Sequence, residues 1–523
     1  MKIWMLSREY AGIAEAGGVK NVACSLSENL VKLGHKVVLF IPLYGCTDLS
    51  KVENYTCVWR SPVQIQIGEK IYTVFFSHGE MNGVEINFIA NRIFFEKKAV
   101  YTYTQEEENS NPSHKKGEGH EDVKLLNSLF QRAVALYGKN CAINEQPNVI
   151  HCQDAPCAML PAFINQLKEQ NENCRKFYEK SKMIVTIHNA GGGYHHEFSN
   201  LQEAQYFTAL PEKILSYGNN CGKIEPFLVA SQFAAITTVS PQYAKEILFD
   251  YVDTGGLGEQ FRNKKISITG ITNGIDFEKY DPDDTKKSCL PFTFNPQKGE
   301  LDGKYKCREY FLENFAYREA KAITQIKEIE RFSYISDIND KTVIISYHGR
   351  VVHQKGIDIM FKSAMSILSN VDNVKFIFAG QGTLELEQQL INLANMFPGK
   401  CVYFRGYDKE LSRLCIASAD FSLHASYFEP CGLEDFTSQT YGTIPVAHAT
   451  GGLCKIVNGR TGFLYKPNDS NQLEKILLSL ITLSKSTEKE FLKPIIQYAS
   501  SYIHEKFPWQ KVVQNEYLKL YQN

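Results

Sequence analysis

The sequence lacks a charge excess, a long apolar run and a signal-peptide core, and each absence excludes a class of protein. Lys and Arg number 57 against 58 Asp and Glu, a net charge of -1. A nucleic-acid-binding protein usually carries a basic excess or stripe. No apolar run reaches the roughly 18 residues of a membrane-spanning helix. The N-terminal segment has no long apolar core, so we do not expect it to act as a secretion signal. We therefore expect neither nucleic acid nor membrane as a partner.

Cysteine pairs at the spacing of a redox or zinc motif are also missing. The 14 cysteines are scattered, without a Cys-x-x-Cys pair. Disulfide scaffolds are short and dense in cysteine, whereas this chain has 523 residues, 43% of them hydrophobic and 22% charged. We expect free thiols, a cytoplasmic location and no metal site. A metal site at His151–Asp154 is disfavoured, because adjacent residues at a strand end converge poorly on one ion.

What the sequence does contain is a repeated strand–helix rhythm. Ile3–Leu6 and Val37–Pro42 read as buried strands, with apolar residues at helical spacing between them. The rhythm restarts at Thr342–Tyr347. We predict an α/β fold of two Rossmann-like, doubly wound parallel-sheet domains facing a deep cleft. The expected bounds are 1–268 for an N-terminal acceptor-side domain and 269–505 for a C-terminal nucleotide-sugar domain.

Two segments stand outside this rhythm. Tyr103–Val123 is almost free of apolar residues and is predicted to be an exposed loop. Residues 506–523 are predicted to form a helix that packs back on the N-terminal domain. Aromatic and apolar residues recur there every four positions, at Trp509, Val513, Tyr517 and Tyr521.

Three N-terminal motifs follow strands and are candidates for ligand binding. Glu15-Ala16-Gly17-Gly18-Val19-Lys20 precedes a helix, and paired glycines allow backbone amides to approach a phosphate or simply to form a tight turn. His188-Asn189 and Asp154 end apolar runs. Each histidine alone is more often a structural, hydrogen-bonded residue than a catalytic one.

The C-terminal half offers cations and a carboxylate at strand ends. Arg350 and Lys355 follow one buried strand, and their charges suit phosphate oxygens, although a solvated ion pair is the alternative. Glu429 follows another strand, before a turn whose amides could bind phosphate; otherwise it is a solvated carboxylate. Gly380-Gln381-Gly382 is an incomplete dinucleotide motif, because Glu385 stands at the third glycine position, and it is read as a tight turn.

Together these motifs resemble the bacterial glycogen synthase and plant starch synthase family, which are retaining glycosyltransferases of the GT-B fold. The resemblance covers essentially the whole chain. Its most specific segments are Phe428–Leu433 and Tyr441–Leu453, supported by Thr237–Ile247, Asn273–Asp276 and Thr461–Tyr465. It implies transfer of glucose from ADP-glucose, possibly UDP-glucose, to the nonreducing end of an α-1,4-glucan with retention, without a cofactor.

The resemblance also implies roles for individual residues. The implied catalytic residues are His188, Arg350, Lys355 and Glu429, and Asp154 and Asn189 would position the acceptor or donor. The implied donor-binding residues are Glu15, Gly17, Gly18, Asn273, Cys431, Gly432, Leu433, Thr450 and Gly451.

Several positions depart from the family pattern. Glu15 stands where the family has a lysine, Tyr427 where it often has an arginine, and Glu434-Asp435 where it has Thr-Gln. A carboxylate at position 15 would repel a diphosphate unless Lys20 compensates for it. The departures leave three explanations: a divergent synthase, an enzyme with another donor or acceptor, or a weakly active or non-catalytic paralogue that binds glucan or regulates a partner. An NAD-dependent oxidoreductase is disfavoured, because no complete glycine fingerprint follows the first strand.

Overall fold

The computed structural model describes residues 1–249, 252–326 and 328–522. The chain divides into two compact units, each described separately. Unit 1 comprises Met1–Asn273 and Trp509–Asn523, and unit 2 comprises Gly274–Pro508. Sequence reasoning set the boundary at 268/269, which would cut the last strand of unit 1, β11 (Ile268–Gly270), from its sheet. No described helix is long and apolar enough to span a membrane.

Unit 1 is built on a nine-stranded sheet with the order β11-β10-β7-β6-β1-β2-β5-β4-β3. From β11 to β5 neighbouring strands run parallel, and β4 and β3 add an antiparallel hairpin. The remaining strands are β1 (Lys2–Leu6), β2 (Lys36–Pro42), β3 (Glu53–Ile67), β4 (Lys70–Met81), β5 (Val84–Ala90), β6 (Val149–Gln153), β7 (Lys182–Ile187) and β10 (Ala235–Thr238). The first strand and helix were correctly predicted, since β1 is almost entirely buried and α1 (Val19–Lys32) follows it.

The prediction that Tyr103–Val123 forms an exposed loop was wrong in part. Its polar run contains a short helix, α3 (Gln105–Ser110), which Thr104 and Glu107 close with a reciprocal capping box. Tyr103 is buried and stacks on His114, with ring centroids 4.1 Å apart. A capping box can be recognised in the sequence, but here the prediction relied only on the polarity of the segment and missed the helix. The long helix α4 (Val123–Tyr137) then begins where the loop was expected to end.

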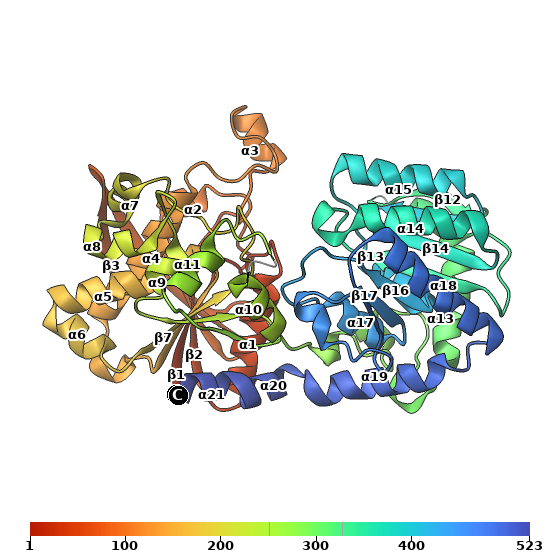
Figure 1. Cartoon of the computed structure of the whole chain (residues 1–523). Helices are drawn as coiled ribbons and strands as arrows, with labels where there is room; N and C mark the ends of the chain where they lie inside the picture. The colour runs from red at the N-terminus through yellow and green to blue at the C-terminus, as the bar shows by residue number, and fades with distance from the viewer. Residues whose placement is uncertain (250–251, 327, 523) are drawn as a thin grey trace. The chain divides into compact units, whose positions relative to one another are not determined.

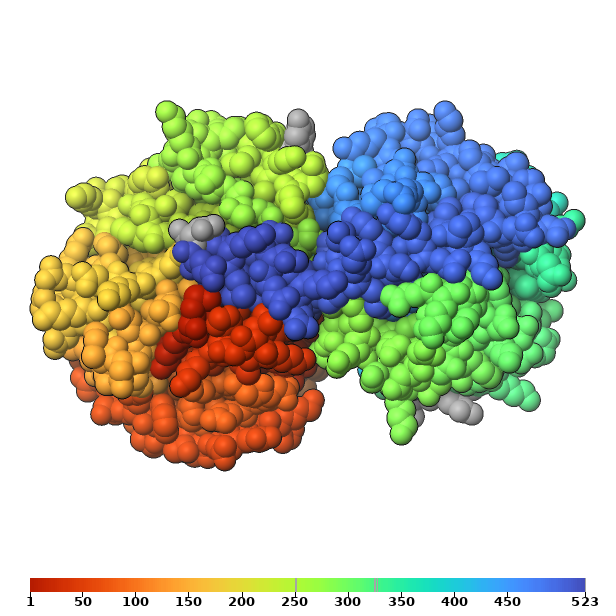
Figure 2. Space-filling model, turned by 90° about the horizontal axis from the view of Figure 1, so that it is seen from below, coloured from red at the N-terminus to blue at the C-terminus, as the bar shows by residue number. Residues whose placement is uncertain are grey.

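The C-terminal segment packs on unit 1, beside the N-terminal elements (Figures 1 and 2). It consists of α20 (Trp509–Val512), a single π-helical turn (Val513–Tyr517) and α21 (Leu518–Gln522). All four residues of the predicted apolar face are buried. The Tyr521 hydroxyl lies 2.8 Å from Nδ1 of His151, whose Nε2 lies 2.6 Å from Oγ1 of Thr186. Burial lowers the pKa of His151 to about 3, so this ring is a neutral structural group.

Unit 2 contains a seven-stranded sheet with the order β12-β15-β14-β13-β16-β17-β18, parallel except for β12. The strands are β12 (Glu330–Ile335), β13 (Val343–His348), β14 (Val374–Gly380), β15 (Lys400–Arg405), β16 (Phe421–His424), β17 (Ile444–His448) and β18 (Phe463–Tyr465). Two apolar cores separate along β13, since Val343 and Ile345 contribute to one and Ile344 to the other. Helices therefore cover both faces, as Figure 1 shows.

The first core packs against α14 (Ile357–Asn370), α15 (Leu384–Met396) and α18 (Ser470–Ser486). The second packs against α13 (Asp302–Phe311) and α16 (Lys409–Ser418). The remaining long helix of unit 2, α19 (Leu492–Lys506), supports α17 (Glu434–Thr440). A parallel sheet covered on both faces is the doubly wound arrangement that the strand–helix rhythm predicted.

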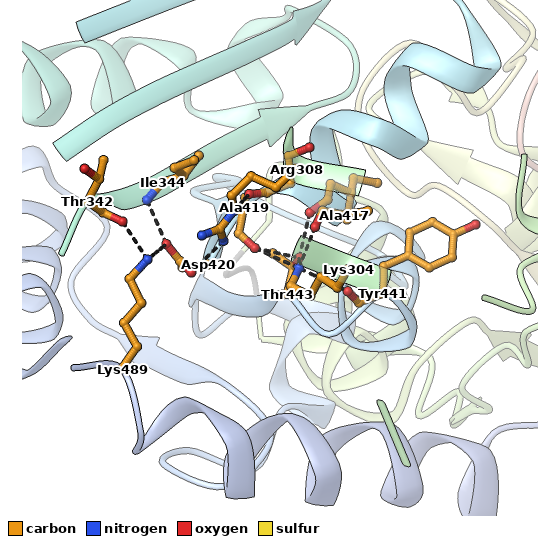
Figure 3. Close-up of polar contacts among 12 residues, drawn as sticks. Lys304, Arg308, Thr342, Ile344, Ala417, Ala419, Asp420, Tyr441, Thr443 and Lys489 are labelled. Atoms are coloured by element: carbon orange, nitrogen blue, oxygen red, sulfur yellow. Dashed lines mark hydrogen bonds and ion pairs between the residues drawn. The ribbon is translucent and has the colours of Figure 1, made fainter. Parts of the chain in front are cut away.

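A buried polar network connects α13 to the N-terminal end of β16 (Figure 3). Asp420 accepts bonds from Arg308 at 2.7 Å, Lys489 at 3.0 Å and the Ile344 amide at 2.9 Å. Lys304, also on α13, donates to carbonyls at the end of α16, including those of Ala417 and Ala419. Asp420 therefore compensates two cations, Arg308 and Lys489, whereas burial lowers the pKa of Lys304 well below its ordinary value.

Candidate active site

The strand order of unit 2 reverses its direction between β13 and β16. These strands are parallel neighbours, yet β14 and β15 lie on one side of the pair and β17 and β18 on the other. Successive crossovers therefore leave in opposite directions, and ligands of doubly wound sheets bind at such a switch point, beyond the carboxyl ends of the strands. The loops 349–356 and 425–433 follow β13 and β16 at this edge.

Lys355 and Glu429 meet across these two loops. The Lys355 ammonium lies 2.5 Å from Oε2 of Glu429, which also accepts a bond from the Ser426 hydroxyl at 2.9 Å. Both side chains of the ion pair are largely buried, at 18% and 12% exposed. Burial raises the pKa of Glu429, but Lys355 and Ser426 outweigh it, so the pKa lies below its ordinary range. The carboxylate is therefore ionised and fixed in place.

Arg350 lies on the same loop but extends into solvent. Its guanidinium donates to Oε1 of Gln354 at 3.2 Å, and Gln354 in turn donates to the Phe428 carbonyl at 3.2 Å. The turn Gly380-Gln381-Gly382 supports this loop, because the Val351 amide donates to the Gln381 carbonyl at 2.9 Å. The exposed guanidinium is thus tied to the loop that carries Lys355 and remains accessible to an anion.

The loop after β16 is hydrogen-bonded to the turn after β17. Thr450 and Gly451 in this turn are buried. The Gly452 amide donates to the Glu429 carbonyl at 2.8 Å. A Cβ atom on Gly452 would lie 1.8 Å from the Cys431 carbonyl oxygen, so only glycine fits there. Gly432 has a left-handed backbone, with φ of 68°. Cys431, Gly432 and Leu433 therefore lie where Glu429 and the Thr450–Gly452 turn converge.

The departures from the family pattern in unit 2 have partners within the chain. The Tyr427 hydroxyl donates to Asp358 at 2.8 Å. Glu434 lies 3.2 Å from Nδ1 of His348. Asp435, in the first turn of α17, is paired at 2.8 Å with Lys455. Nothing in the sequence indicates this pair, because the two residues lie 20 positions apart in separate elements. Each of these substituted residues therefore has a hydrogen-bond or ion-pair partner within unit 2.

In unit 1, Asp154 and His188 lie at the ends of the neighbouring strands β6 and β7. The His188 amide donates to Oδ1 of Asp154 at 3.2 Å, and the ring Nε2 donates to Gln153 at 2.7 Å. Asp154 has φ of 64° and ψ of 177°, a strained backbone that non-glycine residues rarely adopt. Burial raises the pKa of Asp154 to about 7 and lowers that of His188 to about 4. The histidine is therefore neutral near pH 7, beside a carboxyl group that titrates there.

The other two polar candidates of unit 1 differ from this pair. Oδ1 of Asn189 accepts a bond from the Gly191 amide at 2.8 Å, so this side chain turns back on its own loop. Asn273 is 3% exposed, and its buried Oδ1 has no partner among the described residues. The structure thus brings Asp154 and His188 together and leaves Asn189 in a structural turn.

The backbone amides of the glycine loop, Glu15–Lys20, already bind a carboxylate of the protein itself, that of Glu9. Oε2 of Glu9 accepts the Gly17 amide at 2.5 Å and the Ala16 amide at 3.1 Å. The Glu15 carboxylate pairs with Lys20 at 2.6 Å and accepts the Gly12 amide at 2.7 Å. Gly18 is open, because a Cβ atom at this position would have no described atom within 4 Å. Lys20 therefore neutralises Glu15, and one of the two glycine amides is already engaged.

One further cluster has metal-like spacing, formed by His195, Glu197 and Glu225. Nδ1 of His195 lies 2.9 Å from Glu225, and Nε2 lies 2.8 Å from the Ala190 carbonyl oxygen. Burial opposes protonation, but the bond to Glu225 prevails and raises the pKa of His195 to about 9. Both ring nitrogens are thus donors, and neither offers a lone pair to a metal. The cluster is an ion pair that anchors the loop after β7.

Comparison with known proteins agrees with this geometry. Residues 2–263 match the family model described as starch synthase catalytic domain, and residues 328–499 match glycosyl transferases group 1. A glycogen synthase of Thermodesulfovibrio yellowstonii is 29% identical, covering 100% of this chain and 97% of that protein. One from Bacillus licheniformis is 27% identical, covering 98% and 93%.

Solved structures show the same fold. The catalytic domain of starch synthase IV from Arabidopsis thaliana, bound to ADP and acarbose, has a TM-score of 0.76 at 21% identity, covering 100% of this chain and 98% of that one. A sucrose-phosphate synthase from Thermosynechococcus elongatus has a TM-score of 0.54 at 15% identity, with the same coverage. The chain therefore has the GT-B fold that the sequence motifs suggested, with one parallel-sheet α/β domain in each unit.

Proposed function

Since the chain belongs to the starch synthase catalytic domain family and is a glycosyltransferase, we propose that it transfers glucose from ADP-glucose to the nonreducing end of an α-1,4-glucan with retention. The observation that carries this proposal is the Lys355–Glu429 pair beside the exposed Arg350, at the switch point of unit 2. It combines two cations suited to a diphosphate with an ionised carboxylate suited to sugar hydroxyls.

In the proposed reaction, Arg350 and Lys355 bind the diphosphate of the donor. Negative charge develops on this leaving group as the bond from the anomeric carbon to the phosphate oxygen breaks. Preplaced cations stabilise that charge without reorganising, and the Gly432 and Leu433 amides add donors to the same group. Thr450 and Gly451 line the nucleotide side. The chain thus supplies its own charge stabilisation, and we propose no cofactor.

Glu429 is proposed to hold the hydroxyls of the transferred glucose. Its Oε2 is occupied by Lys355 and Ser426, which fixes the carboxylate plane and directs Oε1 to a ligand. The depressed pKa keeps this acceptor ionised at neutral pH. Charge-assisted hydrogen bonds of this kind orient a sugar more strongly than neutral ones.

Unit 1 is proposed to supply the remaining polar groups. The neutral His188 ring is suited to hydrogen bonding with the transferred sugar without adding charge, and Asp154 is suited to orienting a hydroxyl. Strain such as that at Asp154 is concentrated at functional sites, where the surrounding structure imposes it. Retention is proposed as transfer on the same face of the sugar, with the acceptor hydroxyl passing its proton to the departing phosphate oxygen.

The donor base is proposed to be adenine. The support is the Arabidopsis structure of the same fold, which was bound to ADP. UDP-glucose is the competing donor, and direct comparison of the two separates them. The proposed partners are accordingly the nucleotide sugar and the glucan chain.

The test is incorporation of labelled glucose into glycogen from ADP-glucose and, in parallel, from UDP-glucose. We expect faster incorporation from ADP-glucose, and release of the label by β-amylase, which requires α-1,4-linked nonreducing ends. Lys355→Met should lower kcat/KM by about 100- to 1,000-fold, because it removes a cation from the leaving group. Lys362→Met, an exposed lysine on α14, is the matched control and should leave activity unchanged. Folded protein that transfers glucose from neither donor would refute the proposal.

A further inference from the structure

Lys455 is a buried lysine at the end of the 3-10 turn Gly451–Lys455. Its ammonium contacts the loop 425–433, which we call the donor loop. The side chain is 6% exposed. It donates to the carbonyls of Cys431 at 2.8 Å, Gly432 at 2.6 Å and Gly452 at 3.1 Å, and to Oδ1 of Asp435 at 2.8 Å. Four acceptors surround the three N–H groups of an ammonium, so the charged form is fully used.

The carbonyl contacts fix the direction of the neighbouring amides. In a trans peptide the carbonyl of one residue and the N–H of the next point in opposite directions. The Cys431 and Gly432 carbonyls point at Lys455, so the N–H groups of Gly432 and Leu433 point away from it. Gly432 is left-handed, with φ of 68°, and Leu433 is right-handed, with φ of -111°. Successive residues of opposite hand form the concave set of N–H groups that binds anions.

The buried carboxylate of Asp435 balances the charge of Lys455 and holds its ammonium in one orientation. Its carboxylate is completely buried, while Lys455 carries the only opposite charge among the bonds described for it, so the pair is neutral as a unit. The Lys455 ammonium also lies 4.4 Å from the ring of Phe436. It is thus held on several sides and cannot swing toward a ligand. It acts on a bound donor through the carbonyls that it holds, and its charge also helps to lower the pKa of Glu429.

We propose that Lys455 is a positioning residue for the donor diphosphate: by binding the carbonyls of Cys431 and Gly432, it aims the Gly432 and Leu433 amides at the phosphates. The inference rests on the proposed function, since it takes this loop to be the donor site. Lys455 does not itself contact the donor. Asp435 completes the arrangement by holding the ammonium under the turn.

The test compares Lys455→Met with Lys489→Met, a matched control in the same unit. Lys489 is also buried, and it donates to the Thr342 carbonyl at 2.6 Å and to Asp420 at 3.0 Å (Figure 3). It lies at the opposite end of β13 and β16 from the donor loop. Calorimetry would measure the dissociation constants of ADP and of AMP, which lacks the second phosphate, for both variants and the unsubstituted protein.

We expect Lys455→Met to weaken ADP binding by about tenfold or more, because two amides lose their orientation. AMP binding should weaken less, so that the preference for ADP over AMP shrinks. Lys489→Met should lower thermal stability and leave both constants unchanged. If Lys455→Met does not fold, Asp435→Asn is measured in the same way, and a loss of at least about threefold in ADP affinity is expected.

The outcomes separate the inference from the function on which it rests. If the unsubstituted protein does not bind ADP, the donor site itself is wrong. If it binds ADP but Lys455→Met retains that affinity, or if both lysine variants lose it equally, the positioning role is overturned and the proposed function stands.

Discussion

Replacing Asp420 by asparagine should destabilise unit 2 selectively. Asp420 is 3% exposed and is the carboxylate that compensates Arg308 and Lys489, with Lys304 beside them. Burial raises the pKa of Asp420, but the two paired cations dominate and lower it to about 2. Asparagine keeps the shape and an acceptor for the Ile344 amide, so the charge is what the substitution removes.

The expected loss can be worked out in two ways. The pKa lies about 2 units below its ordinary value of 3.8, and each unit corresponds to about 1.4 kcal/mol, which gives about 2–3 kcal/mol at neutral pH. Leaving the partner cations of a buried pair uncompensated costs about 3–5 kcal/mol. For a unit of this size, 1 kcal/mol shifts Tm by about 2–4 °C, so the two estimates together predict a fall of roughly 4–20 °C.

The two units can be followed separately, because all three tryptophans, Trp4, Trp59 and Trp509, lie in unit 1. Circular dichroism should show the destabilised transition, and tryptophan fluorescence should not shift. The folded-state pKa is depressed, so the contribution of Asp420 is present above pH 4 and disappears as the pH falls through about 2. Adding Lys489→Met should recover part of the loss. A Tm within 2 °C of the unsubstituted protein, or no recovery in the double variant, would refute the reasoning.

Three further predictions concern unit 1. Glu15→Lys removes the partner of Lys20 and places two cations in the glycine loop, so the KM for the donor should fall several-fold. Glu15→Gln should lower this KM less. Unchanged kinetics in both variants would show that the loop does not face the phosphates. Asp154→Asn should reduce glucose transfer. The raised pKa makes the Asp154 carboxyl destabilising as the pH rises from about 4 to about 7, so this variant should gain more thermal stability at pH 8 than at pH 4. An equal change at both pH values contradicts this. Tyr521→Phe leaves Nδ1 of the buried His151 without its partner, costing about 1–3 kcal/mol; the tryptophan fluorescence Tm should fall, and an unchanged Tm would exclude a stabilising contact.

The strands and helices that carry the candidate site could be predicted from local pattern. Buried strands ending near Tyr347 and Ala425, each followed by polar residues, already indicated that Lys355 and Glu429 lie at strand ends. The apolar face of the C-terminal segment was visible in the spacing of its aromatic residues. The boundary predicted at 268/269 falls within β11, a three-residue strand that is too short to give a periodic signal.

The contacts between those residues could not be predicted in the same way. Lys355 and Glu429 touch because β13 and β16 are sheet neighbours, although two strands separate them in the sequence. The Lys455–Asp435 pair was hidden for the same reason, and sequence comparison with the family showed Asp435 only as a departure. The strain at Asp154 is a backbone property that no residue pattern encodes.

The sequence by itself determined the fold class, the family and the edge of each sheet where the chemistry lies, because burial periodicity and strand-end motifs are local. Only the tertiary structure decided which charges are paired, which amides are already engaged and which lysine sits behind the donor loop. Those properties depend on strand order and on burial, and a charged group is stable in the interior only where the fold brings it a partner.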